Sequence, residues 1–452
     1  MKQSLRIASV FLVVLTLSGC GESITAPEYK VNLEMWGVFD DSDMYTRPFA
    51  EYHKANPRTG TIKYRKFNVE TYKAELLDSM ASGTGPDIFM IRNTWLPDFK
   101  DKIVPAPASV LLPKDVQDNL IDVVHADMYD AAAGGYYGLP LSVDSLALYY
   151  NRDILQSAGV ATAPTTWEEL ISLLPKVTRV NQFGNIEVAG AAIGGGRNIN
   201  RSIDILSLVL AQLGGSMNSN PDTWKRALEF YLSFTDINNP ARYTWNAESH
   251  YSVDAFAEGR LAMMFGYSYH VNTLRAKHSK LNFAVAPMVQ FQGTAPKNIA
   301  NYWVLVVAKN KKADIVPLSQ TESWTADQER SIRLMESWQL ITALALPHPG
   351  GAMVLQHATV SEVTNPVTLA ADLGALYLEA SGKPAARRDL IAEQQTDVWM
   401  DPFVRGNLIA TSTLGKRDMD SIEGAITDTI DNVLAGRISL TQALSTIAAT
   451  LR

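Results

Sequence analysis

Residues 136–170, YYGLPLSVDSLALYYNRDILQSAGVATAPTTWEEL, are the stretch that decides the fold. Apolar and aromatic residues are dense from Ser142 to Tyr150, which predicts a strand. A short helical segment at 154–158 then ends at Gly159, and Thr165 or Thr166 can cap the helix that follows. The predicted order is strand, short helix, turn and helix. Many α/β proteins share this order, so it predicts a fold class and no function.

Strands and helices also alternate before this stretch. Apolar alternation at 31–36 predicts a strand, and helical spacing at 44–55 predicts a helix. A strand at 61–67, a helix at 69–80 and a strand at 87–91 follow. This alternation predicts a parallel sheet with right-handed crossovers, whose ligands collect at the carboxyl ends of the strands.

Four stretches resemble one protein family. Residues 138–160, GLPLSVDSLALYYNRDILQSAGV, with APTTWEEL at 163–170, resemble the inter-lobe crossover of family 1 extracellular solute-binding proteins, the sugar-binding receptors of bacterial ABC importers. ASGTGPDIFMI at 81–91, VDAFAEGRLAMMFGYSYHV at 253–271 and NYWVLVVAKN at 301–310 resemble the same family in the same order. The resemblance implies a two-lobe, type II periplasmic-binding-protein-like α/β fold. Each lobe is then a mainly parallel sheet flanked by helices, with the ligand cleft between the lobes.

The length of 452 residues also favours two domains, because one core seldom supports so long a chain. The chain is expected to cross between the lobes more than once. The expected division assigns residues 30–142 with 284–325 to lobe 1, and residues 143–283 with 326–452 to lobe 2. Residues 20–29 are expected to form a tether.

The N-terminus predicts the compartment. Lys2 and Arg6 precede an apolar core at 7–17, and Leu17-Ser18-Gly19-Cys20 follows. This resembles a lipoprotein signal peptide over 1–19, which would make Cys20 the acylated residue. The alternative is an ordinary secretory signal that contains a cysteine. We expect an extracytoplasmic protein, in the periplasm or on the outer face of the cytoplasmic membrane, anchored by acyl chains alone.

Composition and motifs exclude several classes of function. A formal charge of −7 without a long basic run argues against nucleic acid as a partner. HExxH, CxxC and GxSxG motifs are absent from the sequence, which argues against a zinc site or a hydrolase elbow. The Asp40-Asp41-Ser42-Asp43 stretch lacks the central Gly and closing Glu of an EF-hand. We therefore expect no cofactor, no metal and no catalysis.

Candidate ligand-binding residues combine aromatic and polar side chains, because a sugar site needs flat apolar surface with hydrogen-bonding groups around it. The strand ends of the first lobe, the crossover and the strand ends of the second lobe supply them. Any of the tryptophans could equally be core. The candidates are Trp36, Asp40, Asp41, Arg92, Asn93, Trp95, Asp144, Arg197, Trp245, Tyr267, Tyr269 and Trp303.

The expected function is that of a monomeric receptor, which captures a mono- or oligosaccharide by hinge closure and delivers it to ABC importer permease subunits. One alternative is a surface glycosidase that uses two of the carboxylates. Another is a structural or adhesive lipoprotein. Polyamine, peptide and sugar-phosphate ligands also stay open, since Arg92 and Arg197 would suit an anionic group whereas the aromatic and acidic lining suits neutral sugars or cations.

Overall fold

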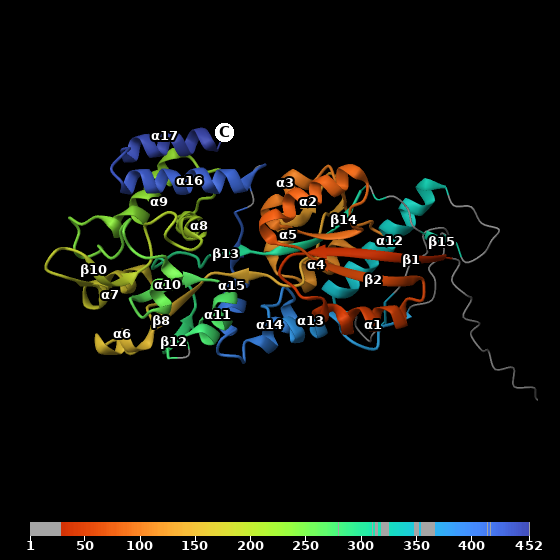
Figure 1. Ribbon diagram of the computed structural model, residues 1–452, viewed down its shortest axis with the longest axis horizontal. Helices are drawn as coiled ribbons and strands as arrows, with labels where there is room; N and C mark the ends of the chain where they lie inside the picture. Colours follow the sequence, from red (N-terminus) through yellow and green to blue (C-terminus); the bar gives the residue numbers. More distant parts are fainter. Residues whose placement is uncertain are drawn as a thin grey trace, which may run out of the picture.

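The computed structural model describes residues 29–278, 280–309, 311, 315–317, 325–347, 352–353, 367–413, 415 and 417–451. These residues form two lobes, each a sheet covered by helices, with a smaller sheet between them (Figure 1). The buried apolar side chains fall into two cores, one for each lobe. The predicted two-lobe α/β fold is confirmed. The proposed signal peptide and Cys20 lie outside the described residues.

The sheet of lobe 1 is built around β1 (Tyr29–Gly37). β2 (Thr59–Lys66) and β3 (Ile88–Arg92) pair with β1 in parallel, and Met35 lies opposite Ile88. β14 (Trp303–Ala308) runs antiparallel to β3, and β4 (Ile103–Val104) and β15 (Ile315–Pro317) complete the sheet.

Helices of lobe 1 come from two parts of the chain that are far apart in sequence. The N-terminal part supplies η1 (Ser42–Tyr45), α1 (Thr46–Ala55), α2 (Val69–Ser82), η2 (Asn93–Trp95), α3 (Leu96–Phe99), α4 (Pro113–Asn119) and α5 (Asp122–Met128). The later part supplies α12 (Ala326–Ala345), α13 (Leu373–Ser381) and α14 (Arg388–Gln394). The small pairs β5 (Tyr129–Asp130) with β6 (Gly135–Tyr136), and β16 (Ala352–Met353) with β17 (Val367–Thr368), accompany them.

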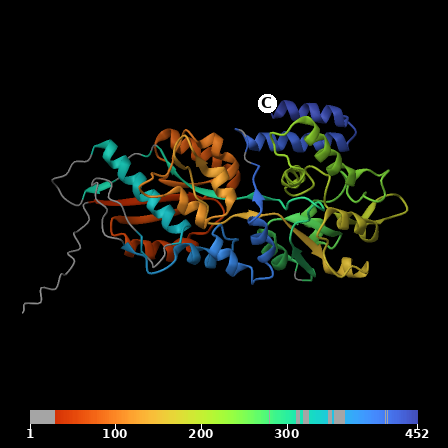
Figure 2. The same cartoon turned by 180° about the vertical axis from the view of Figure 1, so that it is seen from behind.

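Lobe 2 has a five-stranded sheet in the order β12 (Phe283–Ala286), β8 (Ala147–Asn151), β11 (Leu261–Gly266), β10 (Ile186–Ala191), β9 (Arg179–Val180). Its helices are α6 (Arg152–Ser157), α7 (Trp167–Val177), α8 (Ser202–Gln212), α9 (Pro221–Leu232), η3 (Ser233–Thr235), α10 (Ser252–Ala257), α11 (Tyr269–Lys277), α16 (Met419–Leu434) and α17 (Leu440–Thr450). α16 and α17 pack beside α8 and α9, as both Figure 1 and the view from behind in Figure 2 show. None of the described helices is long and apolar enough to cross a membrane.

Three short strands connect the lobes. β7 (Asp144–Ser145), β13 (Asn298–Asn301) and β18 (Ala410–Thr411) form a sheet in the order β18-β13-β7. α15 (Asp401–Asn407) lies beside it, with Phe403 in the core of lobe 2 and Val404 in that of lobe 1. We call these three strands the hinge sheet.

Both large sheets are mixed, and the hinge sheet explains why. β1 with β3 and β10 with β11 are parallel, as expected for strands that end at the cleft. β8 and β14 instead come directly after hinge strands, enter their lobes from the cleft side and therefore run antiparallel to β11 and β3.

The division into lobes differs from the expected one in two places. Helices α12, α13 and α14 pack on lobe 1 and not on lobe 2, because Ile332, Trp338 and Tyr377 are buried in the core of lobe 1. β12 pairs with β8, so residues 284–286 belong to lobe 2 and not to lobe 1. Helical and strand periodicity predicted these elements, but periodicity does not specify which sheet an element joins.

Trp338→Ala should loosen lobe 1 selectively. Trp338 is fully buried, its indole Nε1 donates to the carbonyl oxygen of Val104 at 3.2 Å, and truncating a buried aromatic costs about 3–5 kcal/mol. We expect faster amide hydrogen exchange in β1, β3 and β14, with little change in β8 and β11. Trp167→Ala, in the core of lobe 2, is the matched control and should give the reverse pattern. Faster exchange in lobe 2 for Trp338→Ala would contradict the assignment of α12 to lobe 1.

Candidate functional site

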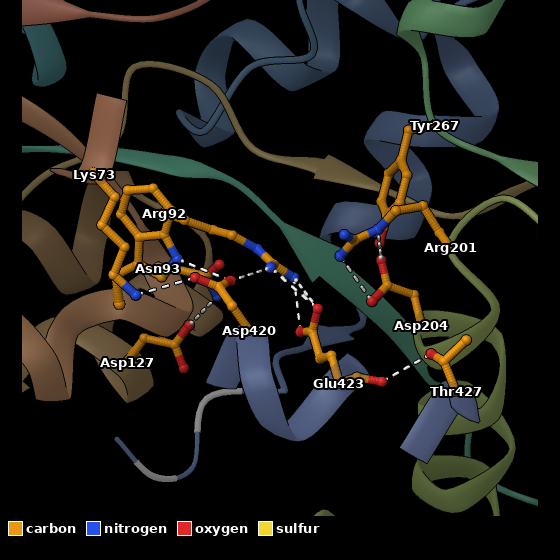
Figure 3. Close-up of polar contacts among 11 residues, drawn as sticks. Lys73, Arg92, Asn93, Asp127, Arg201, Asp204, Tyr267, Asp420, Glu423 and Thr427 are labelled. Atoms are coloured by element: carbon orange, nitrogen blue, oxygen red, sulfur yellow. Dashed lines mark hydrogen bonds and ion pairs between the residues drawn. The ribbon is translucent and has the colours of Figure 1, made fainter. Parts of the chain in front are cut away.

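The candidate site lies where strands of the two lobes end, and each lobe forms one wall of it. In lobe 1, β3 ends at Arg92 and continues into η2. In lobe 2, β11 ends at Gly266 and continues into Tyr267. Figure 3 shows Arg92 directed from lobe 1 toward α16 of lobe 2, with Arg201 and Tyr267 beyond it. The strand ends therefore face a common space, as the geometry of α/β sheets predicts.

The lobe 1 wall has buried polar atoms that lack partners. The Arg92 guanidinium donates to both carboxylate oxygens of Glu423, at 2.8 and 3.1 Å. The Asn93 amide nitrogen donates to Asp127 at 3.2 Å. The Nε of Arg92 and the Oδ1 of Asn93 are buried without a hydrogen-bond partner among the described residues. A buried polar atom without a hydrogen bond costs free energy, so a ligand group that bonds one of these atoms would bind more tightly.

Aromatic rings extend this wall. Trp303, at the start of β14, is half-buried and meets Trp95 edge-on, with 5.2 Å between ring centroids. Phe39 also meets Trp303 edge-on, with 5.6 Å between ring centroids, and is 52% exposed. The lobe 1 wall thus offers apolar ring surface next to polar groups.

The lobe 2 wall is built on a buried ion pair. The Arg201 guanidinium donates to Asp204 at 2.7 and 3.0 Å, and the Tyr267 hydroxyl donates to the same carboxylate at 2.6 Å. Burial opposes ionisation of Asp204, but the charges of Arg201 and Arg92 outweigh it and hold the pKa of Asp204 below its ordinary value. The Tyr269 ring stacks on Tyr267 at 6.2 Å and is 51% exposed.

The hinge sheet contributes Asp144. Its carboxylate accepts hydrogen bonds from the backbone nitrogen and the hydroxyl of Ser268, at 2.9 and 2.7 Å, and from the nitrogen of Ser145 at 2.9 Å. Burial of this carboxyl group nevertheless raises the pKa of Asp144 to about 7. Asp144 thus joins β7 of the hinge sheet to the loop that follows β11.

The first turns of α16 complete the site. Asp420 and Glu423 line an open cavity of about 340 Å³ between α8 and α16. Arg197 and Arg201 line the same cavity from the side of α8. Burial opposes ionisation of Asp420, but hydrogen bonds from Trp95 and Lys73 and the charges of Lys73 and Arg92 hold its pKa below the ordinary value.

Several sequence candidates lie elsewhere. Trp36 is buried against Phe67, and Trp245 is buried in the core of lobe 2. Asp40 is fully buried and accepts hydrogen bonds from the hydroxyls of Tyr45 and Tyr377 and from Lys383. Asp41 forms a surface ion pair with Lys66. Arg197 is different from these, because it is exposed, pairs with Asp428 and lines the rim of the cavity between α8 and α16. Proximity to a strand end was therefore insufficient, because these side chains find partners within their own lobes.

Other residues of the site were missed. Asp420, Glu423 and Thr427 recur on one face of α16, while Ile422, Ile426 and Ile430 face the core of lobe 2. This amphipathic spacing is visible in the sequence, but it does not indicate that the polar face meets the other lobe. Arg201 and Asp204 were missed because their surroundings predict only the start of an apolar helix.

A metal centre finds no support here. Within the described part of the chain, no group of three or more His, Cys, Asp or Glu side chains could hold a metal ion. The carboxylates around the cleft are instead bonded to arginine, lysine, tryptophan and serine donors.

Titration of Asp144 should make stability depend on pH in a defined direction. Its folded pKa of about 7 exceeds the ordinary value, so the folded state binds a proton that the unfolded state has released between about pH 4 and pH 7. Relative to Asp144→Asn, the free energy of unfolding should fall as pH rises through this window, by at most about 1.4 kcal/mol per pH unit, and stay level above it.

Urea unfolding of both proteins at a series of pH values measures this difference. Ser268→Ala removes one donor to the carboxylate, which raises the folded pKa further and should extend the upper end of this window to higher pH. A difference between wild type and Asp144→Asn that is flat from pH 4 to pH 7 would contradict the assignment.

Comparison with known proteins agrees with this architecture. Residues 45–316 match the family model of the bacterial extracellular solute-binding proteins. A putative binding protein of Brucella abortus strain 2308 is 23% identical over 235 residues, which cover 50% of this chain and 55% of that protein. A probable ABC transporter-binding protein of Deinococcus radiodurans is 24% identical over 258 residues, or 52% and 58% of the two chains.

Among solved structures, a cyclo/maltodextrin-binding protein complexed with maltotetraose superposes with a TM-score of 0.67 and 14% identity, over 95% of this chain and 98% of that one. This likeness supports the fold, whereas the match to the curated relatives spans little more than half of their length. The family match covers more than half of the present chain. The chain belongs to the family of bacterial extracellular solute-binding proteins.

Proposed function

We propose that this protein is the substrate-binding receptor of an ABC importer and captures a neutral mono- or oligosaccharide between its lobes. The observation that carries the proposal is the pairing of exposed aromatic rings with buried polar atoms on facing walls. Tyr269 in lobe 2 and Phe39 with Trp303 in lobe 1 offer ring surfaces for the C–H faces of a sugar. Arg92 and Asn93 offer hydrogen-bonding atoms for its hydroxyl groups.

The electrostatics of the cleft favour a neutral ligand. Arg92 is paired with Glu423, Arg201 with Asp204, and Arg197 with Asp428. Burial lowers the pKa of His270, next to Tyr269, to about 4, so this imidazole carries no charge at neutral pH. A phosphate group needs cations that are free to bind it, and the arginines of this cleft are already neutralised. We therefore propose that the ligand is a neutral sugar in preference to a sugar phosphate.

Capture would proceed by closure of the lobes about the hinge sheet. A ligand that touches both walls stabilises the closed form through its differential affinity for that form. The short strands β7, β13 and β18 are suited to a hinge, because few residues have to change conformation. The loaded receptor would then be recognised by the permease subunits, and ATP hydrolysis would belong to those partners. The chain itself makes and breaks no bond.

The proposed location is extracytoplasmic, in keeping with a family of extracellular solute-binding proteins. Acylation of Cys20 would anchor the protein, and we propose that it acts as a monomer. The sequence pattern before Cys20 supports this anchor.

Thermal unfolding should identify the ligand class. The purified protein is screened against sugars, oligosaccharides, polyamines, peptides and sugar phosphates. A ligand at one hundred times its Kd adds about 2.7 kcal/mol to the free energy of unfolding, which gives a clear and saturable rise in Tm. We expect such a rise with a neutral sugar that is recovered intact. A sugar recovered cleaved would instead favour the glycosidase, and a rise only with sugar phosphates or polyamines would overturn the neutral-sugar proposal.

Tyr269→Ala should weaken binding of the identified sugar about tenfold, because a stacked ring contributes about 0.5–1.5 kcal/mol beyond the area it buries. Isothermal titration calorimetry measures the change. Phe183→Ala is the matched control, since Phe183 is 79% exposed in the turn between β9 and β10 and is not part of the cleft. Equal affinities of wild type and Tyr269→Ala for the sugar would show that the Tyr269 ring does not contact it.

A further inference from the structure

Helix α16 belongs to one lobe and bonds to the other. Its apolar face, with Ile422, Ile426 and Ile430, is buried in the core of lobe 2. Its first two turns contact lobe 1 through Asp420 and Glu423 (Figure 3). α17 packs along α16, so lobe 2 fixes this helix over most of its length.

The contacts with lobe 1 form a continuous network. Arg92 binds Glu423 through two nitrogens and reaches Asp420 at 3.3 Å. The Trp95 indole nitrogen donates to Asp420 at 3.1 Å. Lys73 of α2 bridges Asp420 at 3.0 Å and Asp98 at 3.1 Å. These bonds join three elements of lobe 1 to a single helix of lobe 2.

The start of α16 adds a further bond of the same kind. The backbone nitrogen of Asp418, directly before the helix, donates to the Asp98 carboxylate of lobe 1 at 2.9 Å. A carboxylate at a helix N-terminus is favoured by the helix dipole. Lobe 1 thus supplies the acceptor that this end of α16 requires.

The central ion pair is shielded from water. The side chain of Arg92 is 9% exposed and that of Glu423 is 12% exposed. Bidentate arginine–carboxylate pairs are among the stronger hydrogen bonds, and burial protects them from screening by salt. An ion pair on the exposed surface would contribute little to stability. This pair is instead largely buried, at the contact between the lobes.

From this network we infer a latch between the lobes, formed by Arg92, Lys73, Trp95 and Asp98 on lobe 1 and by the start of α16 on lobe 2. Separation of the lobes breaks the bonds of Arg92, Lys73 and Trp95 to Asp420 and Glu423 and the bond from Asp418 to Asp98 together, because each of these crosses from one lobe to the other. The latch therefore sets the balance between closed and open forms independently of any ligand. This inference rests on the lobe contacts and does not depend on the proposed function.

The test compares wild type with Asp420→Asn/Glu423→Gln by small-angle X-ray scattering of the purified protein with no ligand added. Asn and Gln keep the size of the side chains but remove the charges. We expect the open-to-closed ratio to rise about tenfold or more, which corresponds to about 1.4 kcal/mol, and the radius of gyration to increase.

The matched control is Asp118→Asn/Glu229→Gln. It also removes two negative charges, but their partners Lys114 and Lys225 lie on the same helices, α4 and α9. This control should scatter like wild type. Lys73→Met removes a cation of the latch without changing α16 and should open the protein in the same direction by a smaller amount.

Scattering by Asp420→Asn/Glu423→Gln that equals that of wild type would overturn the latch. Circular dichroism and cooperative unfolding show whether the variant is folded. If it is not, Lys73→Met decides the matter, and an unchanged radius of gyration in that variant would overturn the inference equally.

Discussion

The constraint on which the structure depends is that the two lobes are joined through one narrow sheet. A single half-buried carboxylate, Asp127, secures two of its strands to lobe 1. Asp127 accepts hydrogen bonds from the hydroxyl of Tyr302, directly after β13, and from that of Ser412, directly after β18, each at 2.6 Å. Burial raises the pKa of Asp127, although these hydrogen bonds and one from Asn93 oppose the rise. The lobe 1 side of the hinge sheet is thus fixed by side chains.

The two walls of the cleft differ in how they neutralise their arginines. Arg201, directly before α8, is paired with Asp204 in the first turn of that helix, so both partners belong to lobe 2 and the pair does not depend on how the lobes are arranged. Arg92 takes its partners from α16 of the other lobe. Lobe separation therefore removes the partners of Arg92 and leaves the Arg201–Asp204 pair intact. A buried charge that loses its partner is costly, so Arg92 must regain water or bind a ligand when the lobes move apart.

The parts of the candidate site that depend on local order could be predicted from the sequence. Arg92, Asn93 and Trp95 follow a buried strand, and Tyr267 with Tyr269 follow another, so the strand-end rule places them at the cleft. Trp36 and Asp40 satisfy the same rule, but neither lines the cleft. Tyr377 is 337 residues from Asp40 in sequence and still binds it, a contact that no local pattern contains.

The contacts of α12 and α16 with distant parts of the chain could not be predicted from local sequence patterns either. The helical pattern of α12 was predicted, but its place in lobe 1 depends on Glu336, which accepts hydrogen bonds from Tyr29 and Asn56 at 2.7 Å and pairs with Arg58. The polar face of α16 was visible in the sequence, whereas its partner on lobe 1, Arg92, lies 331 residues away. Spacing along a chain specifies which face of a helix is buried, but it does not specify what the other face meets.

The same long-range contacts explain how the lobes can move and yet depend on each other. Lobe 1 needs α12 to α14, which come after the whole sheet of lobe 2, and lobe 2 needs α16 and α17, which come after those helices. Neither lobe is a continuous segment, so both cores must form from parts distant in sequence, which is slow because loop closure precedes the contacts that stabilise it. Once the cores have formed, the described residues that connect them are those of the hinge sheet, α15 and the surfaces facing the cleft. One topology thus has two consequences. Each core needs segments that come after the other lobe in the sequence, so the lobes depend on each other to fold. The segments that cross between the lobes are short while the cores they join are large, so few residues hold the folded lobes together.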